Sequence, residues 1–353
     1  MSDSASLFSP PNSFTSPLYE QLKRHPKRIV FSDGEDPRIL RVAEKMVEMG
    51  LGIPIILGKR KRILEIAEKL EVKMDLVRVI QPDLASDFLL FCERLERIER
   101  YRGVNGVNAA EIISKPEYFA AMMVQYGQAD ACLSGNLSNP AGVFRPLLRL
   151  IAPDPKVPCV FAVSILVSET LANFGQSGTL FLSDCGLVAE PTVEELAAIA
   201  VESGKLARHF LGRRPRVALL SHSTHGTSLT APALKVQAAT ALARESVPAL
   251  EIDIDGEIQA DVALDPSAAE LKLPNVERKN PADVLVFPSL DAAHISLKLL
   301  QHVGGAQNYG QIICGLTRPA GQVPRTASVE TILGTAAALG VEAIKYHDLY
   351  PKG

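Results

Sequence analysis

The sequence predicts an α/β protein with mainly parallel sheets and two domains. Short apolar runs that fit strands alternate with amphipathic stretches that fit helices along the whole chain. Several of these runs are continuously apolar, which is typical of strands covered on both faces. The length of 353 residues is sufficient for two domains of ordinary size.

Ten runs fit strands, at residues 28–32, 53–57, 77–80, 130–134, 159–164, 179–183, 216–221, 250–254, 283–289 and 311–314. Amphipathic helices are predicted over 36–50, 192–212 and 290–305. Asp36 caps the first of them, and Thr192 and Glu195 form a capping box at the start of the second. Residues 1–17 are rich in Ser and Pro and are predicted to be a disordered tail.

Composition argues against several classes of protein. The net charge is −3, so no global basic field attracts nucleic acid, and Lys59–Arg62 is interpreted as a solvated helix end. No apolar run reaches the ~18 residues of a membrane span, and the N-terminus does not resemble a secretory signal. The five scattered cysteines fit neither a disulfide framework nor a zinc site, which favours reduced thiols in a cytoplasmic protein. The glycine patterns of a dinucleotide fold and of a P-loop are both missing.

Ligands of parallel sheets bind at the carboxyl ends of strands, and four loops there carry candidate groups. Residues 32–38 hold three acids and an arginine, which predict either a metal or phosphate site or a helix cap. In residues 134–150, Arg145 and Arg149 lie four apart on one helix face, either as a phosphate clamp or as surface ion-pair partners.

The third loop, residues 221–230, has six hydroxyls and two histidines ahead of a helix, which favours an anion site. His222 and His225 can carry protons near neutral pH, but no third metal ligand is near them. In the fourth loop, Arg325 precedes a helix for which Thr326 or Ser328 is the cap. A cation at the positive end of a helix predicts an anionic ligand, or else a neighbouring Asp or Glu. The residues alone therefore indicate a protein that binds a phosphorylated small molecule.

Several motifs occur in the order found in the phosphate acetyl/butyryl transferase family, which the chain resembles from Lys27 to about Leu339. They include "GQADACLSG", "LFLSDCGLVAEPTVEELAAIA" and "GQIICGLTRP". The resemblance implies two doubly wound domains, the second inserted in the first, with a cleft between them as in isocitrate and isopropylmalate dehydrogenases. Domain I would comprise residues 18–153 and 308–353, and domain II residues 154–307.

The resemblance also implies the reaction acyl-CoA + phosphate = acyl phosphate + CoA, by direct attack in a ternary complex. Coenzyme A is then a substrate, no cofactor or metal is needed, and the chain is expected to form a cytoplasmic homodimer. Carried over by position, Arg325 lies beside the thioester, and the further catalytic candidates are Thr326, Ser328 and His222. The substrate-binding candidates are Arg145, Ser221, Ser223, Thr224, Gly226, Thr227, Ser228 and Gly315.

One loop departs from the family pattern. Active members usually have Ser-Arg-Gly at 324–326 and an Asp six residues after the Arg, where this chain has Pro324, Thr326 and Thr331. Proline has no donor and threonine is a poor base. This stretch looks more like the acyltransferase-like module of long malic enzymes, so a catalytically impaired, regulatory acyl-CoA-binding protein is an alternative. A third hypothesis is an oxidoreductase that uses Asp253, Asp255 and Asp261 at a metal.

Overall fold

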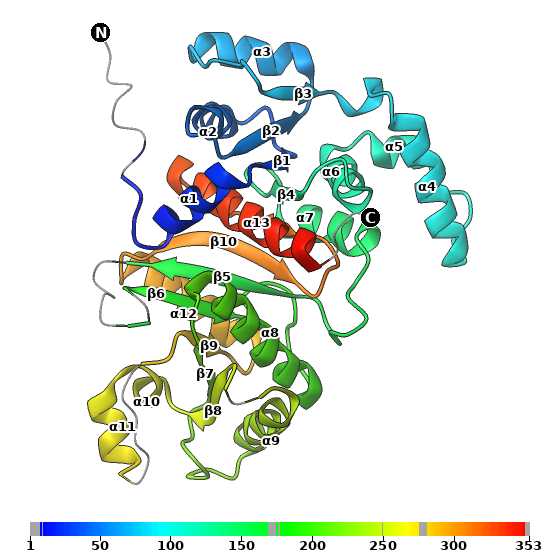
Figure 1. Ribbon diagram of the computed structural model, residues 1–353. Coiled ribbons are helices and arrows are strands. Elements are labelled where there is room, and N and C mark those ends of the chain that lie inside the picture. The colour runs from blue at the N-terminus through cyan, green and yellow to red at the C-terminus, as the bar shows by residue number, and fades with distance from the viewer. Residues whose placement is uncertain are drawn as a thin grey trace. The chain divides into compact units, whose positions relative to one another are not determined.

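The apolar runs of the sequence become strands in two units of the chain (Figure 1). The structure is a computed structural model that describes residues 8, 10–168, 174–175, 177–248, 250–274 and 281–349, with side chains up to residue 345. Unit 1 consists of residues 1–152 and 316–353, and unit 2 consists of residues 153–315. Unit 2 is therefore inserted in the sequence of unit 1.

In unit 1 the strand order is β3-β2-β1-β4-β11, and every neighbouring pair is parallel. The strands are β1 (Lys27–Phe31), β2 (Gly52–Leu57), β3 (Arg78–Ile80), β4 (Ala131–Ser134) and β11 (Ala320–Gln322). The chain moves outward from β1 to β3 and then returns to add β4 on the other side of β1. The strand order thus reverses between β1 and β4, and ligands of parallel sheets bind at such switch points.

Two groups of helices cover this sheet (Figure 1). Helix α13 packs against α1, α2, β1 and β4, while α6 and α7 pack against each other, against β1 and β4, and against β11. The helices of the unit are α1 (Thr15–Arg24), α2 (Pro37–Glu48), α3 (Arg60–Lys69), α4 (Phe88–Tyr101), α5 (Ala109–Ile113), α6 (Pro116–Gln125), α7 (Pro140–Leu150) and α13 (Val329–Leu349), with a 3-10 turn at Pro82–Leu84.

In unit 2 the strand order is β10-β5-β6-β9-β7-β8. The pairs β10–β5 and β5–β6 are antiparallel and the others are parallel. The strands are β5 (Phe161–Val167), β6 (Thr179–Ser183), β7 (Arg216–Leu220), β8 (Asp253–Ile258), β9 (Val284–Val286) and β10 (Gln307–Cys314). The helices are α8 (Val193–Leu211), α9 (Ala231–Ser246), α10 (Ala260–Leu264), α11 (Pro266–Lys272) and α12 (Leu290–His302).

The predicted fold class is confirmed, and a strand occurs at each of the ten predicted runs. The helix starts follow the predicted caps: the Asp36 side chain accepts from the Arg38 amide, and Thr192 and Glu195 form the capping box. Strand β11 was missed because its three residues, Ala-Gly-Gln, carry no apolar run. It is a strand because it lies within the sheet, paired to β4.

Two boundaries differ from those of the sequence analysis. Residues 1–7 and 9 of the predicted tail lie outside the described residues, but its last part is ordered because α1 begins at Thr15. The Asn12 side chain accepts from the amides of Phe14 and Thr15, and the Phe14 side chain is buried. Residues 308–315, assigned to domain I, belong to unit 2 because β10 pairs with β5 along its length.

Candidate functional site

Three loops of unit 1 meet at the switch point, where β1, β4 and β11 end at the same edge of the sheet. The Ser32 amide donates to the Leu133 carbonyl at 3.4 Å, and the Val323 amide donates to the Ser134 carbonyl at 2.9 Å. Gly135 has φ +115°, and a Cβ there would lie 2.3 Å from the Val323 carbonyl oxygen. We call residues 32–38, 135–139 and 323–328 the switch-point loops.

Asp33 ties the first loop to the second. Its buried carboxylate accepts from the amides of Gly135 at 2.8 Å, Asn136 at 3.2 Å and Leu137 at 3.4 Å. Burial raises the pKa of Asp33, and the negative charge of Glu117 adds to this effect, while the amide donors oppose it. The three acids of the loop 32–38 therefore have partners within the protein: Asp33 holds the second loop, Asp36 caps α2, and Glu35 pairs with Arg62 at 3.0 Å.

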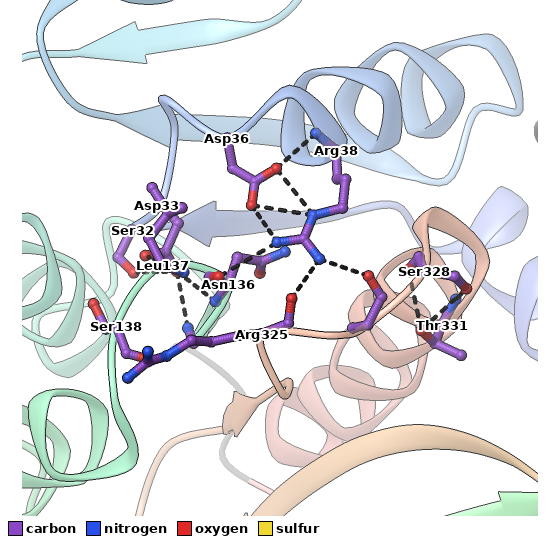
Figure 2. A network of polar contacts seen from close by, with 12 residues as sticks. Ser32, Asp33, Asp36, Arg38, Asn136, Leu137, Ser138, Arg325, Ser328 and Thr331 are labelled. Atoms are coloured by element: carbon purple, nitrogen blue, oxygen red, sulfur yellow. Dashed lines mark hydrogen bonds and ion pairs between the residues drawn. The ribbon is translucent and has the colours of Figure 1, made fainter. Parts of the chain in front are cut away.

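Arg38 ties the third loop to the first two (Figure 2). Its side chain forms an ion pair with Asp36 at 2.6 Å. The same guanidinium donates to the carbonyls of Arg325 at 2.7 Å, Ala327 at 2.8 Å and Asn136 at 3.3 Å. The sequence predicted for the loop of Arg38 either a metal or phosphate site or a helix cap, and not a contact with the other two loops. Its partners lie about a hundred and almost three hundred residues away in the chain, so no local pattern indicates this role.

Arg325 is held by its backbone and has an exposed side chain. Its Nε donates to the Ser138 carbonyl at 3.4 Å, as Figure 2 shows. Among the described residues, no carboxylate forms an ion pair with it. A neighbouring Asp or Glu, the alternative to a ligand, therefore does not neutralise Arg325 in the part of the chain that the structure describes.

The first turn of α13 follows the same loop. Ser328 is its cap, as predicted, since its Oγ accepts from the Thr331 amide at 3.2 Å. The Thr331 hydroxyl donates to the Ser328 carbonyl at 3.0 Å, so it closes this turn. Thr326 is exposed in the turn before the helix and does not cap it. The hydroxyls of Ser328 and Thr331 thus bond within the helix start, whereas Thr326 is exposed outside it.

The proposed clamp of Arg145 and Arg149 does not form. Arg149 donates to Glu99 at 2.9 Å, and this bond holds the pKa of the Glu99 carboxyl below its usual range. Arg145 is exposed on α7, and the Asn139 side chain caps that helix by accepting from the Gly142 amide. The sequence had left open whether these arginines clamp a phosphate or form surface ion pairs. Arg149 forms an ion pair, while Arg145 remains available to a ligand.

In unit 2, the hydroxyl-rich loop 221–230 follows β7 as predicted, but a carboxylate of the protein occupies part of it. The buried Glu257 accepts from the Ser223 hydroxyl at 2.5 Å and from the Gly226 amide at 3.0 Å. Thr224 is also buried, and its hydroxyl bonds to Gln259. Among the substrate-binding candidates of this loop, Ser223 and Thr224 therefore hold the loop together. The candidates that are not buried are Ser221, Gly226, Thr227 and Ser228.

The two histidines of this loop have separate partners. His222 is exposed, and its Nε2 lies 3.2 Å from the hydroxyls of Ser228 and Thr230. His225 pairs with Asp255 at 3.1 Å. Gly315, another candidate, has φ +82°, and a Cβ there would lie 2.4 Å from the Cys159 carbonyl oxygen, which explains the glycine by its backbone alone. Arg325 belongs to unit 1 and His222 to unit 2.

The acids of the oxidoreductase hypothesis are ion-paired. Asp253 pairs with Arg216, Asp255 with Arg244, and Asp261 with Lys272. Within the described residues, no group of three or more His, Cys, Asp or Glu side chains could hold a metal ion. Nor does any helix in this part of the chain have the length and apolar character to cross a membrane.

The switch-point loops and the doubly wound fold define a protein of the α/β class with an exposed guanidinium at a ligand-binding edge. Comparisons with known proteins then give the family. The family described as Phosphate acetyl/butaryl transferase matches residues 13–339. The chain belongs to this family, whose members are acyltransferase enzymes.

Individual relatives are similar to this chain over nearly its full length. The phosphate acetyltransferase of Acetivibrio thermocellus is 33% identical over 94% of this chain and 98% of its own length. A phosphotransacetylase structure from Streptococcus pyogenes has a TM-score of 0.85 at 29% identity, covering 96% of this chain and all of its own. The EutD phosphotransacetylase from Staphylococcus aureus has a TM-score of 0.81 at 30% identity, covering 94% and 98%.

Proposed function

We propose that the chain is a phosphate acyltransferase, which converts acyl-CoA and inorganic phosphate to acyl phosphate and CoA by direct attack. The observation that carries the proposal is the Arg325 side chain, exposed at the switch point and without an acidic partner among the described residues. The similar proteins are named as phosphate acetyltransferases, which favours acetyl-CoA and acetyl phosphate as the first pair to test.

Both reactants offer negative charge to such a group. Phosphate is a dianion near neutral pH, and its attack on the thioester carbonyl develops an oxyanion and then a thiolate. Arg38 donates to the carbonyls of Arg325 and Ala327, so the Arg325 guanidinium extends from a preorganised loop. Electrostatic stabilisation by Arg325 would act on the charge as it develops, and removing such a donor typically costs ~10²–10³-fold in kcat. Thr326 is an exposed hydroxyl next to Arg325 that does not cap the helix, so it can assist Arg325.

The test is acyl phosphate formation from acetyl-, propionyl- and butyryl-CoA with inorganic phosphate. We expect Arg325→Ala to lower kcat by ~10²-fold or more. Lys61→Ala is the matched control, because Lys61 is a cation with 92% side-chain exposure on another helix of unit 1. Equal rates for wild type and Arg325→Ala would remove the proposal.

The relatives are named as transferases, so the comparisons favour turnover over a silent regulatory role. Saturable CoA binding by calorimetry without any acyl phosphate would instead support that alternative. A cytoplasmic homodimer that uses neither metal nor cofactor is a further part of the proposal. Light scattering on the purified chain would test the dimer, and assay in the presence of EDTA would test the metal.

A further inference from the structure

Next to Arg325 lies a pair of side chains, the Ser138 hydroxyl and the Glu117 carboxylate bonded to it. Neither the sequence patterns nor the family resemblance gave this pair a role. The Ser138 hydroxyl donates to Glu117 Oε1 at 2.5 Å. Glu117 comes from the first turn of α6, and Ser138 from the loop after β4. Both side chains are half-buried. The Ser138 carbonyl accepts from Arg325 Nε, and Figure 2 shows the two residues next to one another.

The Glu117 carboxylate is not neutralised by a cation in the described part of the chain. Lys115, which is near Glu117 in sequence, pairs with Glu111 instead. Arg149 on α7 pairs with Glu99. Its polar contact is the hydroxyl of Ser138. Its charge also reaches the buried Asp33. Glu117 is therefore a base at the switch point whose hydrogen-bonded neighbour is a hydroxyl that can pass on a proton.

The proposed reaction requires one proton transfer. When a phosphate oxygen attacks the thioester carbonyl, a C–O bond forms and the C–S bond then breaks, leaving its electron pair on sulfur. Hydrogen phosphate gives up its proton and the coenzyme A sulfur takes one up, so a proton moves from phosphate to sulfur with no other reactant. Arg325 can stabilise charge but cannot carry this proton, because its guanidinium is always protonated.

We propose that Ser138 and Glu117 carry this proton, an inference that rests on the proposed function. Ser138 Oγ gives its proton to the leaving sulfur and is reprotonated from Glu117, which has taken the proton of the phosphate. In the reverse direction the pair removes the proton of the CoA thiol. Both residues are then catalytic, because Glu117 takes the proton from the phosphate and Ser138 delivers a proton to the sulfur.

The experiment compares steady-state kinetics of Ser138→Ala, Glu117→Gln, the double variant and wild type in acetyl phosphate formation. We expect each single variant to lower kcat by ~10²-fold with both KM values within about twofold. Because the two residues act as one unit, the double variant should be no slower than the slower single variant. Glu117→Ala should regain part of its activity in the presence of formate, which a structural role would not produce. Glu111→Gln, an exposed acid that pairs with Lys115 in the same region, is the control and should match wild type.

The outcomes separate the two proposals. If wild type turns over and Arg325→Ala is impaired while Ser138→Ala and Glu117→Gln match wild type, the proton relay is wrong and the proposed function stands. Losses that appear in KM, or that accompany a lowered melting temperature without formate rescue, would also overturn the relay. If wild type forms no acyl phosphate, the proposed function fails and the relay fails with it.

Discussion

Replacement of Arg38 by methionine tests whether the hydrogen bonds of Arg38, and not the helix start, order the Arg325 loop. Methionine keeps the length and the apolar stem of the side chain but removes every donor. The change removes the ion pair with Asp36 and three hydrogen bonds to backbone carbonyls of the switch-point loops. It leaves the cap of α2 in place, because Asp36 accepts there from the backbone amide of residue 38.

The magnitude follows from those contacts. A hydrogen bond from a charged group contributes about 1.5–3 kcal/mol net, and the bond at 3.3 Å to Asn136 is the longest of the three. The Arg38 side chain is 30% exposed, so water replaces part of what is lost. We expect the free energy of unfolding of unit 1 to fall by about 2–4 kcal/mol, which lowers the melting temperature by roughly 4–16 °C.

Thermal unfolding followed by circular dichroism measures the loss, and hydrogen–deuterium exchange over residues 323–331 locates it. Lys45→Met on the same helix is the control, because Lys45 forms only surface contacts, a pair with Glu48 at 3.2 Å and a cation–π contact with the Phe8 ring at 5.6 Å. It should change stability by less than about 1 kcal/mol. A melting temperature for Arg38→Met equal to that of the control, with unchanged exchange in that loop, would refute the reasoning.

Three further predictions concern other parts of the chain. Gly135→Ala should cost more than about 3 kcal/mol and impair activity, because its Cβ would meet the Val323 carbonyl. Gly127→Ala, at φ +72° with open space, should cost only about 1 kcal/mol, and equal melting temperatures for the two would contradict this. Glu257→Gln should destabilise unit 2 by about 1–3 kcal/mol, because the bonds of the buried carboxylate to Ser223 and Gly226 weaken. Hydrogen–deuterium exchange in loop 221–230 measures this loss, and unchanged exchange there would contradict the prediction. Burial raises the pKa of the Cys132 thiol to about 12, so at pH 8 about one thiol in ten thousand is ionised. Iodoacetamide should therefore not modify Cys132 in the folded chain. Mass spectrometry that finds Cys132 alkylated before unfolding would disprove this prediction.

Local patterns predicted the elements of the fold well, because periodicity and caps act over a few residues. The predicted strand 130–134, with three apolar residues at its centre, became the buried strand β4, and Thr192 with Glu195 formed the capping box of α8 as expected. The same local signals failed where a neighbour distant in sequence decides. Strand β11 has no pattern of its own and exists because it pairs with β4. The predicted tail is partly ordered because Phe14 is buried.

The candidate site was predicted in part, and the part that was missed has one physical cause. Arg325 could be found from sequence, since a cation outside a helix start is unfavourable without an anion. Loop 221–230 was also located, but the sequence did not show that Glu257 fills it, because that acid comes from the next strand, β8. Arg149 resembled half of a phosphate clamp until its partner on α4, Glu99, was known.

The sequence by itself determined the alternation of strands and helices, the family, and the loops that end at the ligand-binding edge of each sheet. Only the tertiary structure decided which charged side chains of these loops are bonded to groups of the protein and which are available to a ligand. The reason is that a hydrogen bond or an ion pair requires a distance of about 3 Å between two groups. For groups far apart in the sequence, their spacing along the chain does not indicate their distance in the fold. Asp33 and Arg38 form their contacts when the loops after β1, β4 and β11 meet, and Ser138 in the second of these loops also contacts Glu117 of α6.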